Sequence, residues 1–384
     1  MTDGKFCGPS IRSFALRAGR VALTVMAFLL ISLLVLVGVL LFLSPGSTKP
    51  LLDESGKPLV GSISEKIHVE INGSQQGMFI KSRNPSNPVL LFLHGGTGMP
   101  EYFLTKNYPT RLEDYMTVVW WDRRGAGLSY DSKAQQDVLS IEQYISDTLA
   151  VSNYLRTRFH KDKIYLMAHS GGSIVGIQAA ARAPELYCAY IGVGQITYQL
   201  ESEMLAYEYM VGRYREAGNV SMVRRLEAAP PTMTAPLPAQ YMRLRDKAMH
   251  ELGVGTMRGM KSVMKGVFLA SLLCPDYTLR EKLNIWRGKF SSDAMLWDKV
   301  ISIDLTKLIT ALEVPAYFFH GKYDYTVSYP LTKSYYERLD APVKGFYTFN
   351  QSAHSPLFEE PEKMREIMLA DILTGSRGLA DPEQ

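Results

Sequence analysis

Cysteine is scarce in this sequence. Only Cys7, Cys188 and Cys274 occur in 384 residues. That number excludes a small domain held together by disulfides, and it excludes a thiol-rich zinc cluster. Whether Cys188 pairs with Cys274 stays open at this stage, although the positions favour a small buried hydrophobic residue for each.

The sequence also lacks a strong excess of charge of either sign. Its 42 lysines and arginines stand against 38 aspartates and glutamates, so the formal net charge is +4. No dense run of basic residues and no RNA-binding signature occurs along the chain, which excludes nucleic acid as a partner. The hydrophobic share of 46% is that of a folded protein and excludes a disordered or fibrous chain.

Charge is absent altogether from one long segment near the N-terminus. Residues 21–43 are 23 residues without a charged side chain. A helix of that length, at about 1.5 Å per residue, crosses a hydrocarbon core of roughly 30 Å. A cleaved signal peptide is the alternative, but its apolar region is usually about 7 to 15 residues and ends at a small-residue cleavage site. We therefore expect an uncleaved transmembrane helix over 21–43, with the lipid bilayer as a partner.

The charges on either side of this segment predict its orientation. The tail 1–20 carries four basic residues and one acidic residue, whereas the two basic residues of the linker 44–63 are offset by two acidic ones. Basic residues favour the cytoplasmic side of a span. We expect a single-pass membrane protein with a cytoplasmic tail 1–20 and a globular part on the other side.

Strand and helix patterns alternate after the linker. Asn72-Gly73 is a hairpin turn signal between two short strand patterns, and buried strands are expected at 88–93, 117–121, 163–167 and 188–193. Helical spacing is found at 140–159 and 172–182. This alternation predicts an α/β fold with a mainly parallel sheet, whose ligands bind beyond the carboxyl ends of the strands.

One strand end has the pattern of a nucleophile. The strand 163–167 runs into Ala168-His169-Ser170-Gly171-Gly172 and then into a helix. In a nucleophile elbow a tight turn between strand and helix exposes a serine hydroxyl. Ser170 is thus the candidate nucleophile, and the alternative is a serine that only caps the next helix.

Two later strand ends supply a base and an acid. The strand 314–319 leads to His320-Gly321-Lys322-Tyr323-Asp324, and the strand 345–349 is followed by Ser352-Ala353-His354. A serine hydroxyl needs a base to take its proton, and an acid to orient that base. We expect Asp324 to orient His354; a turn aspartate and a surface histidine are the alternatives.

Glycines that could bind an oxyanion follow the strand 88–93. Leu93-His94-Gly95-Gly96-Thr97-Gly98 allows close approach of a substrate to backbone N–H groups, and Gly96 and Gly171 are the expected donors. The run lacks the Gly-Lys-Ser/Thr of a phosphate-binding loop. The spacing of the remaining histidines does not suggest a metal site, so we expect no metal and no cofactor.

These motifs together resemble the landmarks of the α/β-hydrolase superfamily, nearest to its proline iminopeptidase-like branch. The resemblance rests on His94-Gly95-Gly96-Thr97-Gly98, Trp121 to Ser129, Ala168 to Ser173, His320 to Asp324 and Ala353 to Ser355. It implies an α/β-hydrolase fold with a mostly parallel eight-stranded sheet flanked by helices. The core would comprise 64–195 and 313–375, with a helical cap inserted over 196–312 and a short tail at 376–384.

Some residues depart from the branch pattern. Its peptidases typically carry HGGPG and GGSWGS, whereas this chain has Thr97, Ala168 and Gly171 at the differing positions. The branch binds the free amine of its substrate with acidic cap residues, and Glu201 and Glu203, with Glu208, are the candidates in this chain. A solvated face of a cap helix is the alternative that the sequence favours for them.

The sequence thus predicts a membrane-anchored serine hydrolase that cleaves an amide or ester bond of a peptide or small molecule through an acyl-enzyme. An aminopeptidase of the proline iminopeptidase type is one form of this prediction. A carboxylesterase or lipase-like enzyme acting on small acyl esters is the alternative. A catalytically inactive ligand-binding relative is the alternative from another class. The sequence does not predict the oligomeric state.

Overall fold

A single eight-stranded sheet organises the globular part of the computed structural model, which describes residues 11–132 and 139–382. The strand order is β1-β2-β4-β3-β5-β6-β7-β8. β1 and β2 pair antiparallel, β2 pairs antiparallel with β4, and all other neighbours are parallel. The bounds are β1 (Ile63–Ile71), β2 (Ser74–Ser82), β3 (Val89–Leu93), β4 (Thr117–Trp121), β5 (Ile164–His169), β6 (Tyr187–Val193), β7 (Ala316–Gly321) and β8 (Lys344–Phe349). The predicted mostly parallel eight-stranded sheet is confirmed.

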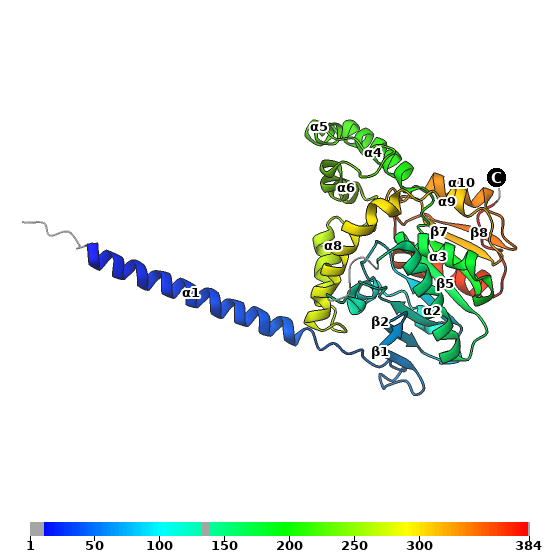
Figure 1. Ribbon diagram of the computed structural model, residues 1–384, viewed down its shortest axis with the longest axis horizontal. Helices are drawn as coiled ribbons and strands as arrows, with labels where there is room; N and C mark the ends of the chain where they lie inside the picture. Colours follow the sequence, from blue (N-terminus) through cyan, green and yellow to red (C-terminus); the bar gives the residue numbers. More distant parts are fainter. Residues whose placement is uncertain (1–10, 133–138, 383–384) are drawn as a thin grey trace, which may run out of the picture.

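Each face of the sheet contributes side chains to a separate hydrophobic core. Alternate residues of a strand point to opposite faces, so Leu91 and Leu93 of β3 belong to one core while Leu90 and Phe92 belong to the other. The first core is completed by α2 (Ile141–Phe159), α3 (Gly171–Arg182) and α10 (Tyr329–Arg338). The second is completed by η1 (Tyr102–Lys106), η2 (Leu112–Asp114), α11 (Pro356–Glu359), α12 (Pro361–Ile367), η7 (Met368–Ile372) and part of the cap. Figure 1 shows α2 and α3 against the sheet.

The chain between β6 and β7 is helical, as expected for a cap. It contains α4 (Gln199–Glu216), α5 (Val220–Glu227), α6 (Ala239–Leu252), η6 (Met264–Phe268), α7 (Leu269–Leu273), α8 (Leu279–Ile301) and α9 (Leu305–Leu308). α4, α5 and α6 share a small core of their own, built around Met210, Leu226 and Leu244. The core of the cap is therefore largely separate from the two cores of the sheet.

The helix α8 is longer than its sequence pattern indicated. The sequence has helical spacing over residues 279–287 of the cap, and the helix continues beyond them to Ile301. Gly288 and Ser292 weaken the helical pattern of the sequence. Both are needed for packing, because a Cβ on Gly288 would lie 2.4 Å from the Gly125 carbonyl oxygen and Ser292 lies against Gly98. Close packing against the loops beside the sheet, which we call the sheet unit, therefore outweighs the low helix propensity of these two residues.

The N-terminal helix α1 (Ile11–Phe42) projects away from the globular part (Figure 1). Its segment Ala18–Phe42 is long and apolar enough to cross a membrane, and its side chains are exposed almost throughout. Residues 1–10 of the predicted basic tail lie outside the described residues, and so does Cys7. The other two cysteines, Cys188 and Cys274, are free thiols.

The chain that follows α1 is attached to the cap. The Lys282 ammonium of α8 donates hydrogen bonds to the Leu43 carbonyl and to the Ser44 hydroxyl, each 2.9 Å long. Pro45 forms a bridge with Thr278, which is the N-cap residue of α8. The predicted linker is therefore anchored at its start, directly beside the first turn of α8.

Candidate active site

Ser170 lies in a tight turn between a strand and a helix. β5 ends at His169 and α3 begins at Gly171, so Ser170 alone forms the corner. Its φ is +51° and its ψ is −125°, an unfavourable conformation for a residue other than glycine. The Ser170 N–H donates to the Val193 carbonyl at the end of β6, 2.9 Å away, which helps to hold the corner in place. This is the geometry of a nucleophile elbow.

His354 and Asp324 form a buried pair beyond the ends of β8 and β7. His354 Nδ1 lies 2.8 Å from Asp324 Oδ2. The other oxygen of Asp324 accepts hydrogen bonds from the N–H groups of Thr326 and Val327, each 2.9 Å long. Because Nδ1 is engaged in this way, Nε2 is the ring nitrogen of His354 that remains for a proton from a nucleophile.

The electrostatics of this pair suit a base and its orienting acid. Burial alone would raise the pKa of Asp324, but His354 and the neighbouring His320 lower it. Burial lowers the pKa of His354, although Asp324 opposes that shift. Asp324 is therefore ionised and His354 is neutral near neutral pH, which is the state that a general base requires.

The structure brings the three predicted residues to one edge of the sheet. Gly194, directly after the acceptor of the Ser170 N–H bond, packs against His354, since a Cβ there would lie 3.0 Å from His354 Cε1. The rings of His169 and His354 have centroids 4.9 Å apart. Ser170, Asp324 and His354 thus meet at the carboxyl ends of β5, β7 and β8.

The two expected oxyanion donors lie against each other. A Cβ on Gly171 would lie 2.6 Å from the Gly96 carbonyl oxygen, so the two backbones are in direct contact. Gly96 has a φ of +59°, which favours glycine at this position. Neither N–H group donates a hydrogen bond to another of the described residues. Both remain free to bind a negatively charged oxygen.

Arg123, which sequence reasoning did not select, holds the loop His94 to Gly98 that carries the donor Gly96. We call this segment the oxyanion loop. Its buried guanidinium donates to the carbonyls of His94 and Gly96, at 3.0 and 2.9 Å, and it lies over the ring of Tyr144. Because these hydrogen bonds hold the carbonyl oxygens, they fix the orientation of the peptide groups in the loop. The signal in the sequence was the position of Arg123 just beyond the end of β4, within the motif Trp121 to Ser129.

Glu101 is a second residue that sequence reasoning missed. Its carboxylate accepts a hydrogen bond from the Gly95 N–H at 2.7 Å and lies 2.9 Å from His169 Nδ1. His169 Nε2 in turn lies 2.9 Å from the carbonyl oxygen of His354. Burial opposes charge on His169, but the contact with Glu101 raises the pKa of its ring. One buried carboxylate thereby links the oxyanion loop, the elbow and the loop of the base.

Neither of the two acidic cap residues forms a hydrogen bond or ion pair with Ser170, Asp324 or His354 in the described part of the chain, although Gln199 connects Glu203 to the Thr326 carbonyl. Glu203 is buried, and its carboxylate accepts hydrogen bonds from Arg245 Nε at 2.6 Å and from the Tyr241 hydroxyl at 2.8 Å. Glu201 is exposed on α4. In the described part of the chain, neither residue lines the cavity that contains Gly96.

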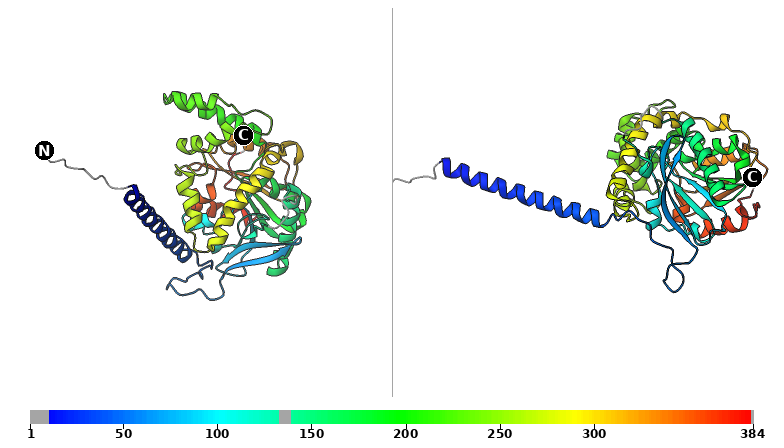
Figure 2. Two further views of the ribbon diagram at one scale, coloured as in Figure 1. Left: turned by 60° about the vertical axis from the view of Figure 1, so that its left-hand side comes forward. Right: turned by 60° about the horizontal axis from the view of Figure 1, so that its bottom comes forward.

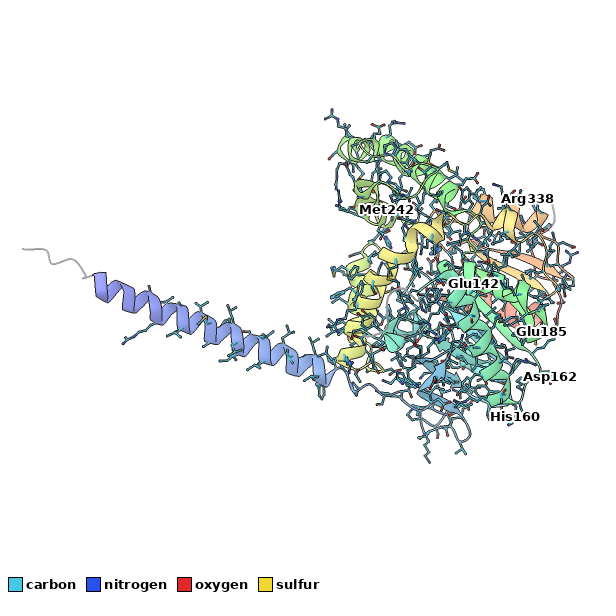
Figure 3. All side chains as sticks on the ribbon, in the orientation of Figure 1. Glu142, His160, Asp162, Glu185, Met242 and Arg338 are labelled. Atoms are coloured by element: carbon cyan, nitrogen blue, oxygen red, sulfur yellow. The ribbon has the colours of Figure 1, made fainter. Side chains whose placement is uncertain are left out.

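That cavity, of about 530 Å³, lies between the oxyanion loop and the cap. Its apolar walls come from Leu237, Met242 and Trp297. Its charges balance, because three basic and three acidic side chains line it: Arg243, Arg245, Lys289, Asp246, Asp293 and Asp298. Figure 3 shows Met242 on α6, at the side of the globular part that α1 approaches. The cavity therefore has mixed polarity and contains one of the expected oxyanion donors, Gly96, in its wall, whereas Ser170, Asp324 and His354 are not among its lining residues.

Comparison with known structures relates this architecture to known hydrolases. A proline iminopeptidase of Mycobacterium smegmatis has a TM-score of 0.57 at 14% identity, covering 81% of this chain and 98% of its own. A membrane phospholipase A, described as a novel bacterial virulence factor, has a TM-score of 0.54 at 17% identity, covering 95% of this chain and 99% of its own. At these identities the likeness shows the fold alone.

Sequence comparison is more specific. The alpha/beta hydrolase fold profile matches residues 88–361. The Bacillus subtilis (strain 168) protein named "Probable aminopeptidase YbaC" is 32% identical over 302 residues, which are 78% of this chain and 93% of that protein. This chain therefore belongs to the alpha/beta hydrolase fold family and is a hydrolase.

Proposed function

We propose that this hydrolase cleaves an amide or ester bond with Ser170 as nucleophile, His354 as base and Asp324 as orienting acid. The observation that carries the proposal is the convergence of the strained Ser170 corner with the 2.8 Å contact between His354 and Asp324. The free N–H groups of Gly96 and Gly171 add the expected oxyanion donors. These features belong to three separate strand ends and have a common use in acyl transfer.

The proposed reaction has two halves. His354 Nε2 takes the proton of Ser170 as its oxygen attacks the substrate carbonyl, and the Gly96 and Gly171 N–H groups bind the resulting oxyanion. The protonated His354 then gives its proton to the leaving amine or alcohol, which leaves an acyl-enzyme. In the second half His354 takes a proton from water as the water oxygen attacks the acyl carbon, and it then gives that proton to the Ser170 oxygen as the acid is released.

Replacing the proposed nucleophile tests this mechanism. We expect Ser170→Ala to abolish covalent labelling of the full chain by a fluorophosphonate probe, with an unchanged circular dichroism spectrum. Ser173→Ala is the matched control, because Ser173 lies in the first turn of α3 and its hydroxyl bonds to backbone groups of Ser170 and Ile196. Labelling that persists in Ser170→Ala would remove Ser170 from its role. A folded, ligand-binding chain that is never labelled would support the inactive-relative alternative.

Aminopeptidase activity is the more specific form of this proposal, and the likeness to the Bacillus subtilis relative supports it. Recognition of a substrate amine by Glu201 or Glu203 belongs to the same proposal. Glu201 forms no ion pair with another described residue, whereas Glu203 would have to exchange its contact with Arg245 for a substrate. Hydrolysis of a proline arylamide, with loss on Glu201→Gln or Glu203→Gln, would support it.

An esterase acting on acyl esters is the second candidate. The balanced charge of the cavity and its apolar walls favour it, since neither feature selects an ammonium group. A panel of proline and other arylamides against acyl esters of several chain lengths separates the two candidates. Hydrolysis of the esters with no activity on any arylamide would reject the aminopeptidase proposal and keep the triad.

Membrane anchoring through 21–43 is also part of the proposal, with the tail 1–20 in the cytoplasm and the hydrolase on the opposite side. The exposed apolar surface of α1 supports it. We expect the protein in cells to keep its full mass of 43.1 kDa and to resist extraction from membranes at alkaline pH. Loss of about 40 N-terminal residues in the mature protein would show a signal peptide instead.

A further inference from the structure

The helix α8 carries apolar side chains on the face that it turns to solvent. Leu283 is 48% exposed and Phe290 is 64% exposed. They are seven residues apart, which is about two helical turns, so they lie on one side of the helix. Trp286 lies between them and contacts Phe290. The opposite side, with Ile285 and Gly288, packs on the sheet unit.

The preceding segment extends this face. Met264, Leu269 and Leu273 of η6 and α7 are 61%, 41% and 56% exposed. The Phe268 ring contacts Trp286, with centroids 5.2 Å apart, and so joins the two elements. We call Met264, Leu269, Leu273, Leu283 and Phe290 the cap apolar face. Neighbouring apolar side chains at this density mark an interaction surface rather than an ordinary solvated one.

The exposed charges around the cap apolar face are mostly basic, and the acid nearest to Phe290 along α8, Asp293, pairs with Lys289 at 2.6 Å. Between residues 261 and 290 every charged side chain in an exposed position is basic, namely Lys261, Lys265, Arg280 and Arg287. The two acids of this stretch are Asp276, which is buried, and Glu281, which pairs with Lys66 at 2.9 Å. An apolar face with basic residues around it complements the acyl region and the phosphate groups of anionic lipids.

The position of this face is fixed relative to α1. Lys282, adjacent to Leu283, bonds to Leu43 and Ser44 at the end of α1. The views of Figure 1 and Figure 2 agree that α8 lies on the side of the globular part that α1 approaches. If α1 crosses a bilayer, the surface of that bilayer lies at Leu43 and therefore beside the first turn of α8.

We propose that the cap apolar face docks on the surface of the bilayer that α1 spans, with its side chains at the boundary of headgroups and acyl chains. This inference rests on the proposed membrane anchoring. Trp297 stands seven residues beyond Phe290 on the same side of α8 and lines the cavity that contains Gly96. Docking therefore brings the cavity close to the membrane surface, where amphipathic substrates with an apolar acyl or aromatic part concentrate.

Lipid quenching of site-specific labels tests the docking. The full chain is reconstituted into vesicles of phosphatidylcholine and phosphatidylglycerol at 3:1, with a bimane label on Phe290→Cys or on Leu308→Cys. Leu308 is the matched control, since it is an apolar residue on α9 with 56% exposure. The unsubstituted chain, labelled in parallel, gives the background from native cysteines. We expect acyl-chain nitroxide lipids to quench the label at 290 at least threefold more than the label at 308.

Further variants separate the possible failures. A label on Leu34→Cys reports whether α1 is in the bilayer. Quenching at 34 with equally weak quenching at 290 and 308 would overturn the docking and keep the anchor. No quenching at 34 would overturn the anchoring and the docking with it. A label at 290 that responds to protein concentration but not to nitroxide lipid would show a second copy on this face, which also overturns the proposal.

Charged substitutions on the face provide a second test. In a chain labelled at Leu273→Cys, we expect the added substitutions Leu283→Glu and Phe290→Glu to lower quenching by nitroxide lipid at least twofold. Unchanged quenching would contradict the docking.

Discussion

His169 Nε2 lies 2.9 Å from the main-chain carbonyl oxygen of His354, and the other ring nitrogen lies 2.9 Å from Glu101. A carbonyl and a carboxylate are both acceptors, so the ring donates from both nitrogens and carries a positive charge. The residue directly before the proposed nucleophile therefore holds the loop of the proposed base. His169 is a positioning residue, and its charge acts on His354.

The acidic limb of the activity profile follows from the state of His354. The base must be neutral, and burial lowers its pKa below the usual value for histidine despite the contact with Asp324. As pH falls, activity is therefore kept through the usual histidine range near 6.5 and lost only at lower pH. The pH dependence of kcat/KM measures this limb. A midpoint above 6.5 would contradict the proposed environment of His354.

Removing the charge of His169 should move the midpoint of this acidic limb to higher pH. The two rings are 4.9 Å apart, and a unit charge at that distance opposes protonation of His354 by about 0.8 kcal/mol even at the dielectric constant of water, or about 0.6 pKa unit. We expect His169→Gln to raise the midpoint by at least about that amount. The exposed His68 on β1 provides the control His68→Gln, which should leave the midpoint unchanged. Equal midpoints for both variants would show that His169 is not charged.

Glu101 should affect both stability and turnover. Glu101→Ala leaves the Gly95 N–H and the His169 ring without a buried acceptor, and breaking a buried ion pair by removing one partner typically lowers the free energy of unfolding by about 3–5 kcal/mol. We expect kcat to fall more than KM rises, because the oxyanion loop loses its support. Glu101→Gln keeps an acceptor for Gly95 and should recover part of kcat. Urea unfolding and steady-state kinetics measure the two effects, and an equal loss in both variants would contradict a role through the loop.

Gly171→Ala should damage the oxyanion site. The new Cβ would lie 2.6 Å from the Gly96 carbonyl oxygen, so one of the two backbones must move. We expect kcat to fall at least about 100-fold, the loss typical of one missing oxyanion donor. Gly212→Ala is the matched control on α4, with no atom near its Cβ, and should be neutral or stabilise by about 0.5–1 kcal/mol. Full activity of Gly171→Ala would exclude Gly171 as a donor.

The parts of the fold that the sequence predicted are those with local signals. Apolar runs revealed the strands, and strand ends pointed to Ser170, Asp324 and His354. The supporting residues were not predictable in this way, because Glu101 and His169 are 68 positions apart and Arg123 reaches His94 across 29. Nothing local distinguishes such residues from a surface acid or a loop arginine. Their roles depend on tertiary contacts that only the folded chain displays.

The length of α8 was also not predictable from local sequence, because it depends on tertiary contacts. Gly288 and Ser292 weaken the helical pattern, yet both fit against glycines of the sheet unit. The pattern also gave no sign that Lys282 would be buried against the end of α1, since a lysine on a helix is usually solvated. The sequence thus indicated a cap and an anchor but not the contact between them.

That contact yields a final prediction. Lys282 is almost fully buried and bonds to the Leu43 carbonyl and the Ser44 hydroxyl, so it fixes the chain between α1 and the cap. Lys282→Met keeps the apolar stem of the side chain but removes both hydrogen bonds, and the linker after α1 should become more mobile. We expect a glutamate-specific endoproteinase to cleave the reconstituted full chain at the exposed Glu54 of the linker at least threefold faster in this variant. Lys299→Met, an exposed lysine near the end of the same helix, is the control and should leave the rate unchanged. Because the two lost hydrogen bonds join the cap to the chain after α1 and not to the triad residues, we expect fluorophosphonate labelling of Lys282→Met to persist. Unaltered cleavage at Glu54 would mean that the bridge between Pro45 and Thr278 is sufficient to fix the junction.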